Sequence, residues 1–250
     1  MKKYIKFFKY LFEFIVIIVF FFIFKILGLK ISSFISRKIF NIFGSIFRSK
    51  KVVSKNLKIA FPKITDVEIE NYTNNMWNYY GEIFVEYLFL KKFRYGDLNN
   101  NIEVVGQNIF DEIKSKDESV IFISGHFDNF ELMAMTIEKS GIKLSAIYRP
   151  LNNFFMNKIM ESLRTKYICK NQIKKGRSNI RDLLRSFNNG SSIALMIDQR
   201  VSEGIKSKFF NKDAYTTTIP AQFVKKFNCK VVPINIERKQ NSKFKLTVFN

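Results

Sequence analysis

Residues 119–131 read SVIFISGHFDNFE, the pattern of a strand that passes directly into a helix. Its first six residues are rich in β-branched and aromatic side chains, as expected of a short buried strand. Gly125 and His126 end the apolar run, and a helix-like stretch then reaches Gly141, which can serve as a C-cap. A strand followed directly by a helix is the unit from which an α/β sheet is built.

The same alternation continues on both sides of this stretch. Thr65-Asp66-Val67-Glu68 resembles a helix start, and helical spacing follows as far as residue 90. Further strands are expected at 143–148 (KLSAIY), 192–197 (SIALMI) and 230–236, with helices at 153–165, 179–187 and after the threonine cluster 216–218. We therefore expect an α/β fold with a mostly parallel central sheet flanked by helices.

Polar side chains follow three of the expected strands. His126 follows the first, Arg149 the second, and Asp198 with Gln199 the third. Ligands of open α/β sheets bind beyond the carboxyl ends of the strands, so these side chains converge if the strands are neighbours. A neutral imidazole can take a proton from a hydroxyl, a carboxylate can orient it, and a guanidinium can hold a phosphate.

Four ordered blocks carry a family resemblance. GHFDNFE is followed by Tyr148–Asn153 (YRPLNN), by Ala194–Gln199 (ALMIDQ), and by Gly204-Ile205 with Phe209-Phe210 before the Pro220-Ala221 helix. Together they resemble the bacterial lipid A late acyltransferase family of the lauroyl/myristoyl type, over about residues 50–240. The resemblance implies an O-acyltransferase that moves a fatty acyl chain from acyl carrier protein to a hydroxyl of a phosphorylated glucosamine disaccharide.

The resemblance also implies the site. His126 is the only histidine and is expected to be the general base, with Glu131 of the His-x4-Glu motif or Asp198 as its carboxylate. We assign substrate binding to Arg149, Asn129, Gln199 and Gly125. No metal site and no cofactor are expected. Asp128 stands where the family commonly has Gly, and it places an additional carboxylate near the site.

Several of these residues have a simpler interpretation. Asp128 to Glu131 also fits a D-x-x-E capping box, and a regular helix would put His126 and Glu131 about 140° apart. Arg149 is alternatively a surface ion-pair partner. Arg177 and Arg181 are expected on a solvated helix face, and Asp213 in a turn.

The N-terminus is expected to anchor the chain in a membrane. Residues 11–29 are apolar or Gly except for Glu13 and Lys25. This segment is long enough to cross a bilayer as a helix. A cleaved signal peptide is the alternative, but no small-x-small pattern follows. More lysines and arginines follow the span than precede it, so we expect a single-pass protein of the bacterial inner membrane with its catalytic domain on the cytoplasmic face.

The remaining composition bounds the partners. The net charge of +21 suits acyl carrier protein, an anionic lipid A precursor and the membrane surface, although an AT-rich genome would also enrich lysine. Nucleic acid is not expected as a partner. The two cysteines lack a zinc or disulfide pattern and fit a reducing compartment.

We divide the chain into a membrane anchor (1–30), a basic amphipathic segment on the membrane surface (31–60) and a catalytic domain (61–250). The single Trp and the end of the chain within the strand-like run KFKLTVF differ from the family, so we expect a fragment or a shortened member. Two other functions remain open. A glycerophospholipid or glycolipid acyltransferase would share the histidine and carboxylate, and a membrane-tethered binding protein would use the charge alone.

Overall fold

The computed structural model describes residues 2–176, 180–201 and 204–250. Its α-helices are α1 (Lys2–Phe47), α2 (Lys50–Ala60), α3 (Asp66–Glu86), α4 (Leu90–Tyr95), α5 (Gln107–Ser115), α6 (Glu131–Lys139), α7 (Phe154–Tyr167), α8 (Ile180–Asn188) and α9 (Ile219–Phe227). Its strands are β1 (Ile102–Val105), β2 (Ile121–Ser124), β3 (Leu144–Tyr148), β4 (Asn171–Lys174), β5 (Ser192–Met196), β6 (Ile205–Phe209), β7 (Lys212–Thr216), β8 (Val231–Arg238) and β9 (Phe244–Val248). Short 3-10 turns lie at Tyr87–Phe89, Asn99–Asn101 and Gln240–Ser242.

The chain forms two compact units. The sheet unit comprises Met1–Phe14, Leu90–Ser207 and Asp213–Asn250, and the helical unit comprises Ile15–Phe89 and Lys208–Lys212. The division of the chain by function at residues 30 and 60 remains a prediction.

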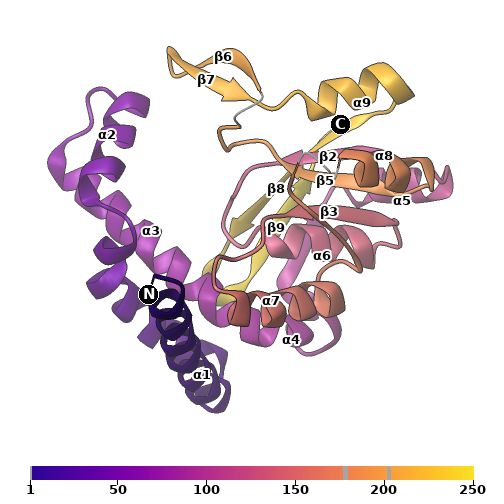
Figure 1. The fold of residues 1–250 in the computed structure, drawn as a ribbon. Coiled ribbons are helices and arrows are strands. Elements are labelled where there is room, and N and C mark those ends of the chain that lie inside the picture. Colours follow the sequence, from indigo (N-terminus) through magenta and orange to yellow (C-terminus); the bar gives the residue numbers. More distant parts are fainter. Residues whose placement is uncertain (1, 177–179, 202–203) are drawn as a thin grey trace. The chain divides into compact units, whose positions relative to one another are not determined.

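A seven-stranded sheet is the centre of the sheet unit, in the order β1-β9-β8-β2-β5-β3-β4 (Figure 1). In the described part of the chain every pairing in this sheet is parallel except that of β8 with β9. The expected α/β class and mostly parallel sheet are confirmed. β6 and β7 form a separate two-stranded sheet that the sequence pattern did not predict.

Helices cover both faces of the large sheet. On one face, Phe187 of α8 and Phe223 of α9 pack with the buried strand residues Ile121, Ile193 and Leu195. α6 packs against β3 and β8, and α7 lies beside β4. Burial of both faces explains why β2 and β5 read as nearly continuous apolar runs in the sequence.

The helical unit is built on α3. This helix begins with the expected signal, since Thr65 and Glu68 form a complete capping box. Trp77 of α3 packs against Gly44 of α1, where any larger residue would meet the indole ring. α1 is long and apolar enough to cross a membrane, which confirms the expected N-terminal membrane segment by length and composition.

Candidate active site

The three strands that carry the candidate residues are neighbours. β2 pairs in parallel with β5, which places Ser124 beside Met196, and β5 pairs in parallel with β3. The carboxyl ends of all three strands therefore meet at one edge of the sheet. Each candidate side chain follows its strand within two residues: His126 follows β2, Asp198 follows β5 and Arg149 follows β3. The strand order therefore brings the three candidates to the same edge of the sheet, as predicted.

Asp198 is the carboxylate that holds His126. Its Oδ1 lies 2.8 Å from Nδ1 of the imidazole, and its Oδ2 accepts a hydrogen bond of 2.9 Å from the backbone N–H of His126. A carboxylate acceptor favours the tautomer with the proton on Nδ1. Nε2 is then left with a lone pair that can accept a proton.

The Nε2 side of the ring faces solvent and Gln199. The His126 side chain is 33% exposed, and Nε2 of Gln199 lies 3.3 Å from Nε2 of the imidazole. The ring of Phe130 packs against the imidazole at an interplanar angle of 70°, with the two ring centroids 4.8 Å apart. A hydroxyl group that replaced the Gln199 amide would reach the basic nitrogen directly.

Gly125 lies against Phe127 and close to Asp198. A Cβ atom at this position would lie 3.4 Å from Oδ2 of Asp198 and 3.1 Å from the ring of Phe127. The second distance is tighter than most packed side chains tolerate. We therefore read Gly125 as the residue that leaves room for the Phe127 ring, and a contact of Gly125 with substrate stays a prediction.

Glu131 has a different environment from Asp198. Arg164 of α7 donates to Oε1 of Glu131 from Nε at 2.8 Å and from Nη2 at 2.5 Å, and both side chains are almost buried. The pair links the start of α6 to α7. A catalytic role for Glu131 therefore remains a prediction, whereas its structural role is evident.

The capping-box interpretation of residues 128–131 is wrong. α6 begins at Glu131, and its N-cap, Phe130, has helical geometry without a side-chain cap. Asp128 instead accepts a hydrogen bond of 2.8 Å from the backbone N–H of Arg238 in β8. Its φ of 37° lies in the left-handed region that glycine favours, and Asp tolerates this region better than most residues.

The other predicted residues differ in exposure. Arg149 is exposed directly after β3, as a phosphate-binding side chain would be. Asn129 is only 2% exposed, so its direct contact with substrate stays a prediction. Arg181 lies on the exposed face of α8 as expected, Asp213 is exposed within β7 rather than in a turn, and Arg177 lies outside the described residues.

Comparison with known families identifies the chain. The family described as bacterial lipid A biosynthesis acyltransferase matches residues 1–249. The chain belongs to this family. It is an acyltransferase of lipid A synthesis, and the resemblance of its sequence blocks is confirmed. A search of curated proteins found no match.

The acyltransferase has a charged network beside its site that the sequence did not reveal. Arg164 lies 5.8 Å from the ring of Tyr148, and the Tyr148 hydroxyl donates to Glu161 at 2.5 Å. Burial, followed by this bond to Glu161, raises the pKa of Tyr148 to about 12. The sequence did contain a sign of this network. Arg164 continues the buried stripe of Met156 and Met160 at four-residue spacing, and an arginine on a buried stripe needs an acidic partner.

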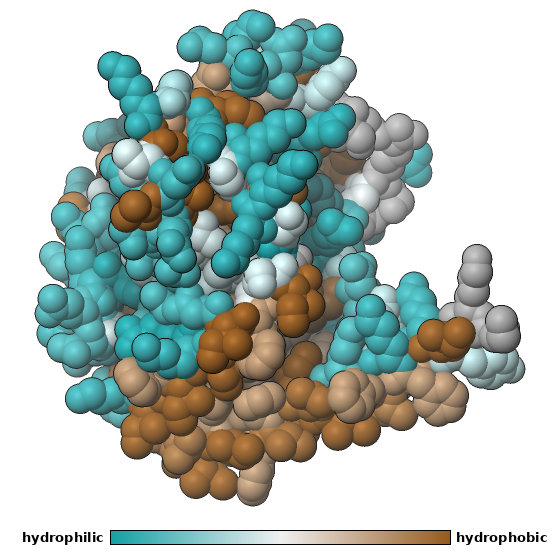
Figure 2. Space-filling model, turned by 90° about the vertical axis from the view of Figure 1, so that its left-hand side faces the viewer, coloured by the Kyte–Doolittle hydropathy of each residue, from teal (hydrophilic) through white to brown (hydrophobic). Residues whose placement is uncertain are grey.

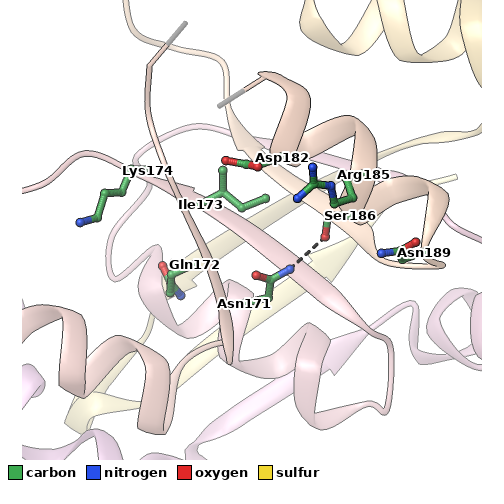
Figure 3. A pocket seen from close by; sticks show the side chains of 8 residues that line it. All are labelled: Asn171, Gln172, Ile173, Lys174, Asp182, Arg185, Ser186 and Asn189. Carbon is green, nitrogen blue, oxygen red and sulfur yellow. Dashed lines mark hydrogen bonds between the residues drawn. The ribbon is translucent and has the colours of Figure 1, made fainter. Parts of the chain in front are cut away.

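A pocket of about 500 Å³ lies elsewhere in the acyltransferase, between β4 and α8 (Figure 3). Two of the polar side chains that line it are hydrogen-bonded to each other, since Asn171 donates to Ser186 at 2.9 Å. β3 and β5 separate β4 from β2, so this pocket belongs to a different part of the sheet from His126. Among the described residues, no cluster of three or more His, Cys, Asp and Glu side chains is placed to hold a metal ion.

Proposed function

We propose that the chain transfers a fatty acyl group from an acyl carrier protein thioester to a hydroxyl group of the lipid A precursor, a phosphorylated glucosamine disaccharide. The observation that carries the proposal is the pairing of His126 with Asp198 at the carboxyl edge of the sheet. This pair supplies an oriented general base, which direct transfer to a hydroxyl requires.

The reaction needs one proton acceptor. Nε2 of His126 takes the hydroxyl proton as the hydroxyl oxygen attacks the thioester carbonyl carbon, and a new C–O bond forms. The C–S bond then breaks, and the thiolate leaving group takes the proton from the imidazolium. Asp198 stabilises the imidazolium between these steps and keeps the ring oriented.

Arg149 is proposed to bind a phosphate of the acceptor. It is exposed at the same edge as His126, and a guanidinium matches a phosphate through two parallel hydrogen bonds. The net charge of +21 favours both anionic partners, the acidic carrier protein and the phosphorylated lipid.

We place the enzyme at the bacterial inner membrane with the sheet unit on the cytoplasmic face. Acyl carrier protein is a cytoplasmic donor, and the basic residues after Gly28 agree with that side. The sequence predicts that α1 crosses the membrane once. The contacts of residues 7–14 with α7 instead favour an arrangement in which α1 does not cross.

The test is acyl transfer by the purified full chain in lipid nanodiscs, with an acyl carrier protein thioester as donor and product masses measured by mass spectrometry. His126→Ala should lower the rate by about 10² to 10⁴, because general-base catalysis contributes this much. Asp97→Asn, which removes an exposed carboxylate paired with Lys92, is the control and should keep the parent rate. Full activity of a folded His126→Ala protein would overturn the proposal.

A further inference from the structure

The first feature is a break in α1. Gly28 has φ 76° and ψ 168°, which no helix contains, so α1 consists of a first arm (residues 2–27) and a second arm (residues 29–47). The hydroxyl of Ser32 in the second arm donates to the carbonyl of Phe24 in the first arm at 2.8 Å, which joins the two arms across the break.

The two arms fold back on each other at this break. The ring centroids of Phe24 in the first arm and Phe40 in the second lie 6.5 Å and 5.6 Å from that of Phe84 in α3. In an unbroken helix, residues 24 and 40 would lie about 24 Å apart. Both arms therefore flank one side chain, and the direction of the chain reverses near Gly28.

The first arm begins against the sheet unit. Asn153, the N-cap of α7, donates from Nδ2 to the carbonyl of Tyr10 at 2.9 Å and to Glu13 at 3.2 Å. The ring of Phe155 packs against Phe7 and Phe14, with centroids at 5.6 Å and 5.4 Å. Residues 7–14 are thus held against the start of α7 in the sheet unit.

The rest of the first arm is too short to cross. The helix from Phe14 to residue 27 is about 20 Å long, whereas the hydrocarbon core of a bilayer is about 30 Å thick. The C-terminal end of the first arm is also held in place, because Lys25 donates to the carbonyl of Leu88 at 2.8 Å. Leu88 is two residues from Leu90, the first residue of the sheet unit after the helical unit.

The second arm leads back to polar surroundings. Arg37 pairs with Glu82 at 3.4 Å, and Asn41 donates to Asn78 at 2.6 Å. Such polar contacts with α3 disfavour a position in the lipid core. The chain therefore leaves the sheet unit at Phe14 and returns to it at Leu90 without a segment suited to an odd number of crossings.

One side of the first arm is an apolar stripe that suits lipid. Its members recur every three or four residues and are each more than half exposed: Phe8, Phe12, Ile15, Val19, Phe22 and Ile26. The opposite side holds Phe14, Phe24 and Lys25, which contact protein. Apolar side chains are correspondingly gathered rather than scattered on the face in Figure 2. A helix with one lipid-facing side and one protein-facing side can lie against one leaflet without crossing the bilayer.

We infer that α1 enters and leaves the membrane on the same face, as a helical hairpin turning at Gly28, and that its exposed stripe is the surface that contacts lipid. The partner is the bilayer leaflet next to the sheet unit. This monotopic arrangement replaces the single crossing that hydropathy favours, and it does not depend on which acyl transfer the site performs.

The first test compares the sides on which two cysteines lie. Lys6→Cys and Val224→Cys, the latter on α9 of the sheet unit, are each made in a Cys229→Ser chain and treated with a membrane-impermeant maleimide in inverted and right-side-out vesicles. We expect both to react from the same side. Reaction of the two variants from opposite sides would overturn the inference.

The second test measures depth and remains decisive if lipid shields residue 6 from the maleimide. Phe12→Trp, Val19→Trp and Ile26→Trp are each incorporated into phosphatidylethanolamine and phosphatidylglycerol vesicles that contain lipids brominated at different acyl positions. The emission of the buried Trp77 is subtracted with the parent chain. A constant depth, or one that changes in one direction, supports the hairpin. A single crossing instead places residue 19 about 10 Å deeper than residues 12 and 26, and this profile would overturn it.

Discussion

Nδ1 of His126 lies 2.8 Å from Oδ1 of Asp198, while the backbone N–H of His126 donates to Oδ2 of the same carboxylate at 2.9 Å. One carboxylate therefore holds both the ring and the backbone of a residue 72 positions away. Because both oxygens are engaged, the carboxylate cannot turn without losing a contact. The orientation of the imidazole depends on Asp198.

Asp198→Asn should lower kcat by about 10² to 10⁴ with little change in KM. An amide can donate to Nδ1, which would move the ring proton to Nε2 and leave no lone pair for the substrate hydroxyl. Steady-state kinetics with both substrates measure kcat and KM separately. A parent kcat in this variant would show that Asp198 does not orient the base.

Glu131→Gln should act mainly on stability. The change leaves the nearly buried guanidinium of Arg164 without its counter-charge, which costs on the order of 3–5 kcal/mol in buried pairs. For a chain of this size Tm should fall by roughly 6 °C or more.

The double variant Glu131→Gln/Arg164→Met removes both charges and should recover part of the lost Tm, as measured by thermal unfolding in detergent. Acyl transfer should recover with it. If Glu131→Gln instead kept the parent Tm and lost kcat, Glu131 would take part in the chemistry.

Arg149→Ala should raise KM for the phosphorylated acceptor by about tenfold or more, since a charged hydrogen bond contributes about 1.5–3 kcal/mol. Arg149→Lys should recover only part, because an ammonium lacks the planar fork. Arg181→Ala on the exposed face of α8 is the matched control. A KM unchanged by Arg149→Ala would remove this residue from the acceptor site.

The two thiols should differ in reactivity. Burial raises the pKa of Cys169 to about 12, and its Sγ also donates to the carbonyl of Leu144 at 3.0 Å. Since the thiolate is the reactive form, native Cys169 should resist N-ethylmaleimide at pH 8.5, while the more exposed Cys229 reacts first.

The raised pKa also has a consequence for stability. Because the folded chain holds the Cys169 proton more tightly than the unfolded chain, this contribution to stability is complete below about pH 9 and is lost as the pH rises toward 12.

Mass spectrometry after timed labelling checks the difference in reactivity between Cys169 and Cys229, and equal labelling rates would contradict it.

Local patterns account for the elements that were predicted correctly. Strands such as β2 and β5 are buried on both faces and appear as apolar runs, and α8 shows its core face at helical spacing. β6 was missed because all of its residues are exposed, so no apolar run marks it as a strand. β4, buried only at Ile173, was missed for the same reason.

The α/β class, the apolar N-terminal segment and His126 as the candidate base could be predicted without coordinates, because they follow from local periodicity and from the only imidazole in the chain. The sequence left Glu131 and Asp198 as candidate partners of that imidazole, and the fold determines which of them contacts it. The motif offered Glu131 five residues away, but the pairing of β2 with β5 brings Asp198 to His126, while Arg164 engages Glu131. Contacts made across a sheet depend on strand order, which no local spacing encodes.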